Sequence, residues 1–145
     1  MKRIALEIIT QERHLLSKTV DKVVLPSVSG ELTILPGHVP LFTRLSDGIV
    51  LLYDGTSVEE FGVLGGFLDV GPNSKVTIMA DSALRAEDVN EARALEAKRL
   101  AEEAMKQKDD MVAFRIAEGS LRLALLELKV ARRSKRRDSS FTSNQ

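Results

Sequence analysis

Cysteine and tryptophan are both absent from this 145-residue chain, and aromatic residues make up only 4% of it. Without cysteine there is no disulfide framework, no zinc finger and no thiol nucleophile. At a hydrophobic content of 43%, so few aromatics mean that the core is built from aliphatic side chains. No window approaches the roughly 20 apolar residues that a membrane-spanning helix needs, so any membrane association is expected to depend on a partner. The chain length predicts one domain, or one domain with an appendage.

Residues for catalysis and metal binding are also scarce. Histidine occurs only twice, as His14 and His38, in different segments. No Ser-His-Asp order and no His-Glu-x-x-His spacing is present, so the usual nucleophilic and zinc-hydrolase patterns are missing. Gly65-Gly66 follows a strand-like segment but opens no helix, which favours a bulge over a phosphate loop. We therefore expect a protein that is not an enzyme and has no metal site.

Charge of one sign is not in excess, because 21 basic and 21 acidic residues give a net charge of zero. The basic residues are nevertheless concentrated near the C-terminus, at Arg132, Arg133, Lys135, Arg136 and Arg137. A helix dipole favours cations in its last turn, but this cluster is larger than capping requires. We expect an acidic protein surface as its target, with an anionic lipid or nucleic-acid surface as the alternative. Because no segment outside this cluster offers a basic face, the acidic protein surface is preferred and nucleic acid is not an expected partner.

The first part of the chain, up to Asp81, alternates short apolar segments with glycine- and proline-containing turns. Strand-like segments cover residues 4–10, 19–25, 31–35, 49–53, 58–64, 67–70 and 75–80. Alternation of apolar and polar residues, with β-branched side chains, is typical of strands with one buried face. Residues 49–53 are instead a continuous apolar run, which indicates a strand buried on both faces or bent across a corner. Asp54-Gly55 is the strongest hairpin signal. The sequence predicts an antiparallel β-sandwich or flattened barrel over residues 1–84.

From Asp88 onward the apolar residues recur with a helical period. Asp88 followed by Glu91 has the form of a capping box, which predicts that a helix starts there. A face of small residues would let a second helix approach closely, and it comprises Ala94, Ala97, Ala101 and Ala104. After a polar turn, the second helix is expected from Met111 to about Arg133, capped by Asp109 or Asp110. Together the two parts predict an α+β chain whose C-terminal part is an antiparallel helical hairpin.

That hairpin is expected to occupy residues 85–137, and the polar segment 138–145 is expected to be disordered. The second helix carries two apolar stripes, whereas packing in a hairpin needs only one. The second stripe therefore indicates another contact, either a separate partner or the β-domain, and the sequence leaves both open. Gly119 lies mid-helix, where glycine costs about 1 kcal/mol relative to alanine. We expect it to permit close packing, with a hinge as the alternative.

The stretch GELTILPGHVPLFTRL, residues 30–45, resembles a motif of the epsilon subunit of F-type ATP synthases. The resemblance continues through Gly65-Gly66-Phe67-Leu68-Asp69-Val70, Met79-Ala80-Asp81 and residues 88–94, and extends to about Arg133. It implies a central-stalk rotor subunit that links the gamma subunit to the c-ring and lies at the cytoplasmic face of the membrane, reaching it only through the complex.

The resemblance also implies site residues. Glu31 and His38 would lie nearest the c-ring, and the C-terminal helices would inhibit ATP hydrolysis. Extended, these helices would reach the alpha/beta catalytic head, where the basic cluster would meet an acidic loop. A generic adaptor without any ATPase would fit the composition, but it would not fit this series of motifs.

An ATP-sensing module is the alternative function. Some bacterial family members bind ATP at the hairpin through an isoleucine/leucine-aspartate-x-x-arginine-alanine motif. The corresponding residues here begin at Val89, and Arg93 and Ala94 match while Asn90 replaces the aspartate. That replacement removes a charge and leaves a neutral amide. Arg93 is thus a candidate ATP contact, and no cofactor is otherwise expected.

Overall fold

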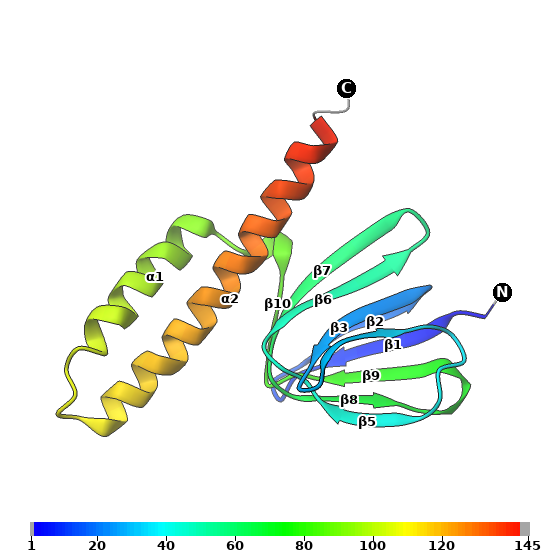
Figure 1. The fold of residues 1–145 in the computed structure, drawn as a ribbon, viewed down its shortest axis with the longest axis horizontal. Helices are drawn as coiled ribbons and strands as arrows, with labels where there is room; N and C mark the ends of the chain where they lie inside the picture. The colour runs from blue at the N-terminus through cyan, green and yellow to red at the C-terminus, as the bar shows by residue number, and fades with distance from the viewer. Residues whose placement is uncertain (1, 143–145) are drawn as a thin grey trace. The chain divides into compact units, whose positions relative to one another are not determined.

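A computed structural model describes residues 2–142 of the chain, with side chains described for residues 2–136. The chain divides into two compact units, Met1–Arg85 and Ala86–Gln145. Figure 1 shows that the first unit consists of β-strands and the second of two helices. The boundary after Arg85 lies next to the one expected from the sequence, where the β-domain was predicted to end at residue 84.

The first unit contains two sheets of five strands each. The strands are β1 (Ile4–Ile9), β2 (His14–Val20), β3 (Lys22–Ser27), β4 (Gly30–Ile34), β5 (Leu41–Arg44), β6 (Gly48–Asp54), β7 (Ser57–Leu64), β8 (Phe67–Val70), β9 (Lys75–Met79) and β10 (Ser82–Arg85). One sheet has the order β2-β1-β9-β8-β5 and the other β10-β7-β6-β3-β4. The predicted sandwich is confirmed, and its sheets do not close into a barrel. Antiparallel pairing dominates, but β1 and β9 pair in parallel, which local alternation cannot reveal.

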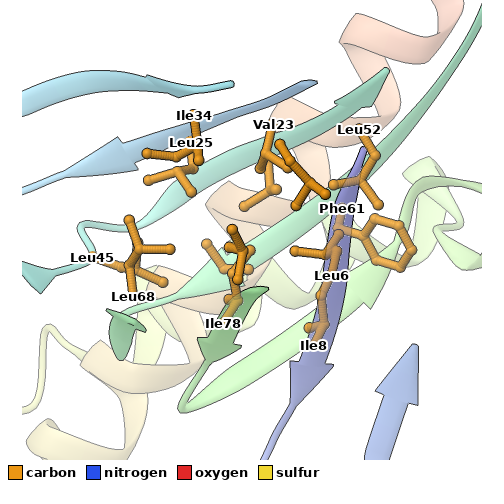
Figure 2. Close-up of a cluster of buried hydrophobic side chains, with 14 of the residues drawn as sticks. Leu6, Ile8, Val23, Leu25, Ile34, Leu45, Leu52, Phe61, Leu68 and Ile78 are labelled. Carbon is orange, nitrogen blue, oxygen red and sulfur yellow. The ribbon is translucent and has the colours of Figure 1, made fainter. Parts of the chain in front are cut away.

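The core lies between these sheets and is almost entirely aliphatic (Figure 2). On β1, Ile4, Leu6 and Ile8 are at most 1% exposed, and they alternate with more exposed residues as the period of two predicts. Phe61 is the one aromatic residue of the described core cluster. All members of this cluster lie within Met1–Arg85, so the sandwich has a hydrophobic core of its own.

Charged residues tie the two sheets together at one end of the sandwich. Lys18 on β2 pairs with Glu59 on β7 and lies 3.8 Å from a carboxylate oxygen of Asp54. Arg3 pairs with Asp54 and donates from Nε to Asp21 Oδ1 at 3.1 Å. These residues come from strands, or the ends of strands, of both sheets, so the network limits how far this end can open.

The second unit is a hairpin of α1 (Glu91–Ala104) and α2 (Met111–Thr142), preceded by the short 3-10 turn η2 (Ala86–Asp88). Asn90, not Asp88, caps α1, because its backbone is extended and its Oδ1 accepts from the Arg93 N–H at 3.2 Å. The expected cap at Asp88 is wrong because that residue belongs to η2. At the second helix, Asp110 Oδ1 accepts from the N–H groups of Val112 and Ala113, at 3.0 and 3.2 Å.

Helix packing differs from the expected row of alanines. Ala94 and Ala101 are buried, whereas Ala97 and Ala104 are exposed. The half-buried residues beside the buried pair are Lys98 and Met105. The packed face of α1 therefore follows a spacing of four, three and four residues, which keeps it on one side of the helix.

Two further expectations for α2 fail. Gly119 is exposed, and a Cβ added there would meet no atom within 4 Å, so the close-packing interpretation is wrong. The helix also continues through residues 138–142, where disorder was expected, and residues 143–145 lie outside the described part. Extending an existing helix gains one hydrogen bond for each residue that it fixes, without the cost of starting a new helix. No glycine or proline follows Gly119 to interrupt the helix. Neither described helix is long and apolar enough to cross a membrane.

Candidate functional site

The clearest candidate for recognition is the turn between β4 and β5, Leu35-Pro36-Gly37-His38. The His38 N–H donates to the Leu35 carbonyl oxygen at 3.1 Å and closes a β-turn. Gly37 has a φ of +83°, and Pro36 stands before it, which is the residue pattern of a type II turn. Because β4 belongs to one sheet and β5 to the other, the turn lies where the chain crosses between the two layers.

Apolar side chains project from this crossing. Leu35 is 52% exposed and Val39 71% exposed, whereas His38 is half-buried. The His38 Nδ1 lies 2.7 Å from the Val39 carbonyl oxygen, so the ring is oriented by the backbone that follows it. Exposed aliphatic residues at a tightly bonded turn give a small apolar surface of defined geometry.

Glu31, the other residue expected at this site, is exposed but lies near the opposite end of β4. It pairs with Pro26 across the β3–β4 hairpin, whereas the Leu35–His38 turn follows the far end of the strand. At about 3.3 Å per residue, β4 separates Glu31 from Leu35 by roughly 13 Å. The structure therefore does not bring Glu31 and His38 together, and a partner would contact them at two separate points.

Sequence reasoning missed an exposed aromatic pair next to the turn. Phe42 on β5 and Phe67 on β8 stack with their ring centroids 5.4 Å apart, and they are 63% and 40% exposed. The register Phe42↔Asp69 and Arg44↔Phe67 makes the rings diagonal neighbours on one face of the sheet. The sequence contained a signal for this pair, which is the alternation along residues 67–70. If Leu68 and Val70 face the core, as they do, then Phe67 must point outward. The stacked pair is a second exposed apolar feature, on the sheet that follows the turn in sequence.

The N-terminus of α1 holds the other candidate residues, Arg93 and its neighbours. Arg93 is exposed, and Asn90 already uses its amide oxygen to cap the helix. Glu91 pairs with Lys135 at 3.3 Å, which places an acidic residue of this site in contact with the basic cluster of α2. One turn later, the hydrogen bond from the Arg99 guanidinium lowers the pKa of the Glu96 carboxyl.

The basic cluster of α2 is exposed over its described part, which comprises Arg132, Arg133, Lys135 and Arg136. The side chain of Arg137 lies outside the described residues. Because α2 continues to Thr142, the cluster lies more than one turn before the last described helical residue. A helix dipole acts only within the last turn, so end-capping does not explain these charges. Lys135 is engaged by Glu91, so the cluster is not simply a solvated run of cations.

Exposed apolar residues also mark the first half of α2. Met111, Val112 and Ile116 are 63%, 69% and 66% exposed. The second of the two apolar stripes comprises Ala113, Ile116, Leu123, Leu126 and Val130. Ala113 and Ile116 are exposed whereas Leu126 and Val130 are buried, so only the first part of that stripe is uncovered in the structure. Among the described residues, no group of three or more His, Cys, Asp or Glu side chains is arranged to hold a metal ion.

Comparison with known proteins gives a consistent set of relatives. The family model for the ATP synthase delta/epsilon chain β-sandwich domain matches residues 3–86. The ATP synthase epsilon chain of Dehalococcoides mccartyi is 44% identical over 138 residues, covering 94% of this chain and 97% of that one. The epsilon chain of Herminiimonas arsenicoxydans is 43% identical over 129 residues, with coverages of 88% and 91%.

Solved structures share the fold. A chain in the mitochondrial ATP synthase of Euglena gracilis superimposes with a TM-score of 0.71 at 23% identity, covering 88% of this chain and 79% of that one. A chain in the central stalk and c-ring structure of the Tetrahymena thermophila mitochondrial ATP synthase gives 0.57 at 16% identity, with coverages of 88% and 97%. At these identities the superpositions support the fold alone.

Proposed function

The chain belongs to the ATP synthase epsilon-chain family, and we propose that it works as a rotor subunit in the central stalk, joining the gamma subunit to the c-ring. The observation that carries this proposal is the 44% identity to an epsilon chain over 94% of the sequence. The architecture agrees with such a role, because a sandwich with its own core can serve as a rigid platform for protein contacts.

We propose that the sandwich faces the c-ring through Glu31 and the turn that contains His38. Both residues lie on or beside β4, and the turn presents exposed Leu35 and Val39. Since β4 separates the two points by roughly 13 Å, the contact would need a broad partner surface rather than a single pocket. A ring of repeated subunits offers such a surface.

The helical hairpin is the regulatory part of the proposal. The exposed Val112 and Ile116 and the basic residues of α2 would be the contacts when the helices reach the gamma subunit and the alpha/beta catalytic head. Exposed apolar residues at the start of α2 and an exposed cationic segment further along it suit a partner that is apolar at one end and acidic at the other. In this arrangement the helices would hold the rotor and inhibit ATP hydrolysis.

The chain itself would be non-catalytic and would lie at the cytoplasmic face of the membrane as part of the complex. We propose further that it works without bound nucleotide. Arg93 is the candidate ATP contact, but Glu91 and Glu96 lie near it in sequence and the Asn90 amide is occupied as a helix cap. Carboxylates close to a phosphate site weaken its attraction for a polyanion.

Co-purification tests the central proposal. An affinity-tagged chain, expressed in its own host, should recover a gamma-like subunit together with a c-ring and the catalytic subunits. A second tagged chain, in which Phe42 and Phe67 are replaced by Ser, is the control. Any recovery that it shares with the wild-type chain does not depend on these two exposed residues of the sandwich. Recovery of the wild-type chain without any ATP synthase subunit would contradict the proposal and would favour a general adaptor.

A further inference from the structure

The connection between β8 and β9, which contains the short turn η1 (Pro72–Ser74), carries two consecutive non-glycine residues with a left-handed backbone. Asn73 has a φ of +61° and Ser74 a φ of +60°. Residues with a Cβ avoid this region, and serine tolerates it less well than asparagine. The Gly71 N–H donates to the Lys75 carbonyl oxygen at 2.8 Å and closes the loop around both residues. Such strain persists only where the surrounding structure holds it, and it concentrates at functional positions.

The side chain of Ser74 shows what this backbone achieves. Ser74 is only 8% exposed, and its Oγ accepts a hydrogen bond from the Gly37 N–H at 2.7 Å. Gly37 is the third residue of the Leu35–His38 turn and lies 37 positions away in sequence. The loop between β8 and β9 thus reaches the turn at which the chain crosses from β4, in the other sheet, to β5.

Two hydrogen bonds therefore define the turn. One, from the His38 N–H to the Leu35 carbonyl, lies within it, and the other ties Gly37 to Ser74. The side chains of Leu35 and Val39 are more than half exposed, so only the half-buried Pro36 and His38 can add packing to these bonds. Without the bond to Ser74, only local bonds would remain, the one within the turn and the contact of His38 Nδ1 with the Val39 carbonyl oxygen.

We propose that Ser74 is a positioning residue, which holds the Leu35–His38 turn in the conformation that it presents to its partner in the rotor. This inference rests on the proposed function, because it assumes that the turn makes a contact. Glycine at position 74 would relieve the backbone strain, yet it would leave Gly37 without its acceptor. A turn that is ordered before binding loses less entropy when the complex forms.

Two variants separate the hydroxyl from the strain. Ser74→Gly removes both, whereas Asn73→Gly relieves the same kind of strain at the neighbouring residue and leaves the Ser74 hydroxyl in place. Amide hydrogen exchange of the full-length chain, read by NMR, reports on the Gly37 N–H directly. Exchange at Gly37 should be about fivefold faster in Ser74→Gly and unchanged in Asn73→Gly, because only the first loses an acceptor.

Denaturant unfolding of both variants serves as the control for global stability. Asn73→Gly should unfold at the denaturant concentration of the wild-type chain or above it, since it exchanges a strained residue for glycine. Ser74→Gly gains the same relief but loses a buried hydrogen bond, so its Gly37 exchange is compared with that of core amides in the same variant, which report global unfolding. An unchanged Gly37 exchange rate in Ser74→Gly would overturn the proposal. Equal acceleration in Asn73→Gly would overturn it as well, because strain rather than the hydroxyl would then control the turn.

The assembled enzyme supplies the second readout, the number of protons pumped per ATP hydrolysed. Ser74→Gly should lower this ratio and Asn73→Gly should not.

His38→Trp separates the hypothesis that the turn contacts a partner from the hypothesis that Ser74 positions the turn. If His38→Trp leaves coupling intact, the contact itself is absent and the proposed function of the turn fails, while Gly37 exchange still decides whether Ser74 orders it. If His38→Trp uncouples the enzyme but Ser74→Gly does not, the turn needs no positioning and the proposal about Ser74 is overturned.

Discussion

Glu91, in the first turn of α1, pairs with Lys135 in the basic cluster of α2, with 3.3 Å between the carboxylate oxygen and Nζ. This contact joins the N-terminus of one helix to a residue 44 positions later. The pair occupies Lys135, a cation that the proposed inhibition would place at the catalytic head. The ion pair would therefore favour the folded hairpin and compete with a contact at the catalytic head.

Substitutions at the two ends of this pair should act in opposite directions. Glu91→Gln should strengthen the inhibition of ATP hydrolysis, because it releases Lys135, and Lys135→Ala should weaken it. Exposed ion pairs contribute about 1 kcal/mol or less, so each change should be fivefold at most. Hydrolysis rates of the assembled enzyme at low and high salt measure the effect. Equal inhibition in both variants would show that the pair has no regulatory part.

His38 should matter for coupling more than for folding. Its ring is half-buried and is oriented by the carbonyl of the neighbouring Val39, so His38→Ala should change the free energy of unfolding by no more than about 0.5 kcal/mol. His38→Trp adds bulk at the proposed c-ring contact and should weaken assembly or proton-coupled ATP synthesis. Wild-type assembly and pumping by His38→Trp would argue against that contact.

The charge network of the sandwich predicts a pH dependence of stability. The Gly55 N–H donates to Asp21 Oδ2 at 2.6 Å, and this bond, with Arg3, lowers the pKa of the Asp21 carboxyl. Because the pKa is lower in the folded state, the stabilisation is fully present above the ordinary value of about 3.9 and disappears as the pH falls through the lower folded value.

Denaturant unfolding at a series of pH values measures this contribution. Asp21→Asn should be less stable than the wild type at pH 7, and the difference should shrink below about pH 4 as Asp21 is protonated. Asp69→Asn, on the exposed face of β8, is the matched control. A stability difference for Asp21→Asn that stays constant down to pH 2 would contradict the assignment.

Nucleotide binding to the isolated chain should be weak or absent. Arg93 is exposed near Glu91 and Glu96 in sequence, and an aspartate of the ATP-binding motif is replaced by Asn90, which caps α1. Calorimetry with ATP and the full chain tests this expectation. A micromolar affinity would overturn it, and Arg93→Ala should then abolish the binding. Arg99→Ala is the matched control, since Arg99 is held by Glu96 and Glu103.

The sequence predicts the sandwich and seven of its ten strands, because most strands carry their own pattern. It misses β2, β5 and β10, and the strand expected at 19–25 spans the turn between β2 and β3. Ile4, Leu6 and Ile8 alternate strictly, and Asp54-Gly55 marks the hairpin between β6 and β7. The parallel pairing of β1 with β9 depends on contacts between strands far apart in the chain, which no local period encodes. The cap at Asn90 was missed because Asp88 fits the same pattern and only the backbone conformation separates the two.

The candidate site was harder to predict for the same reason. The turn around Gly37 is evident from its proline and glycine, but its bond to Ser74 joins two loops 37 residues apart. Glu31 and His38 are close in sequence, yet β4 places them at opposite ends. Propensity rules do not assign serine a left-handed backbone, so the strain at Ser74 appears only in the structure.

Removal of the hairpin tests the regulatory proposal most directly. The core cluster of the sandwich contains no residue beyond Ala80, so a chain ending at Arg85 should fold and unfold cooperatively. It should still enter the complex, and the assembled enzyme should hydrolyse ATP faster than one with the full chain. Thermal or denaturant unfolding of the truncated chain comes first, since a non-cooperative transition would show that the helices complete the core.

Charge substitution then distinguishes the basic cluster from the rest of the hairpin. Replacing Arg132, Arg133, Lys135, Arg136 and Arg137 with alanine should relieve part of the inhibition that truncation removes. Replacing the exposed Val112 and Ile116 with serine tests the exposed apolar residues of α2 in the same way. If charges carry the contact, inhibition by the full chain should weaken with salt, because exposed charges are screened beyond about 10 Å at 0.1 M. Equal hydrolysis rates for truncated and full-length enzymes under all nucleotide conditions would leave the hairpin only a bracing role.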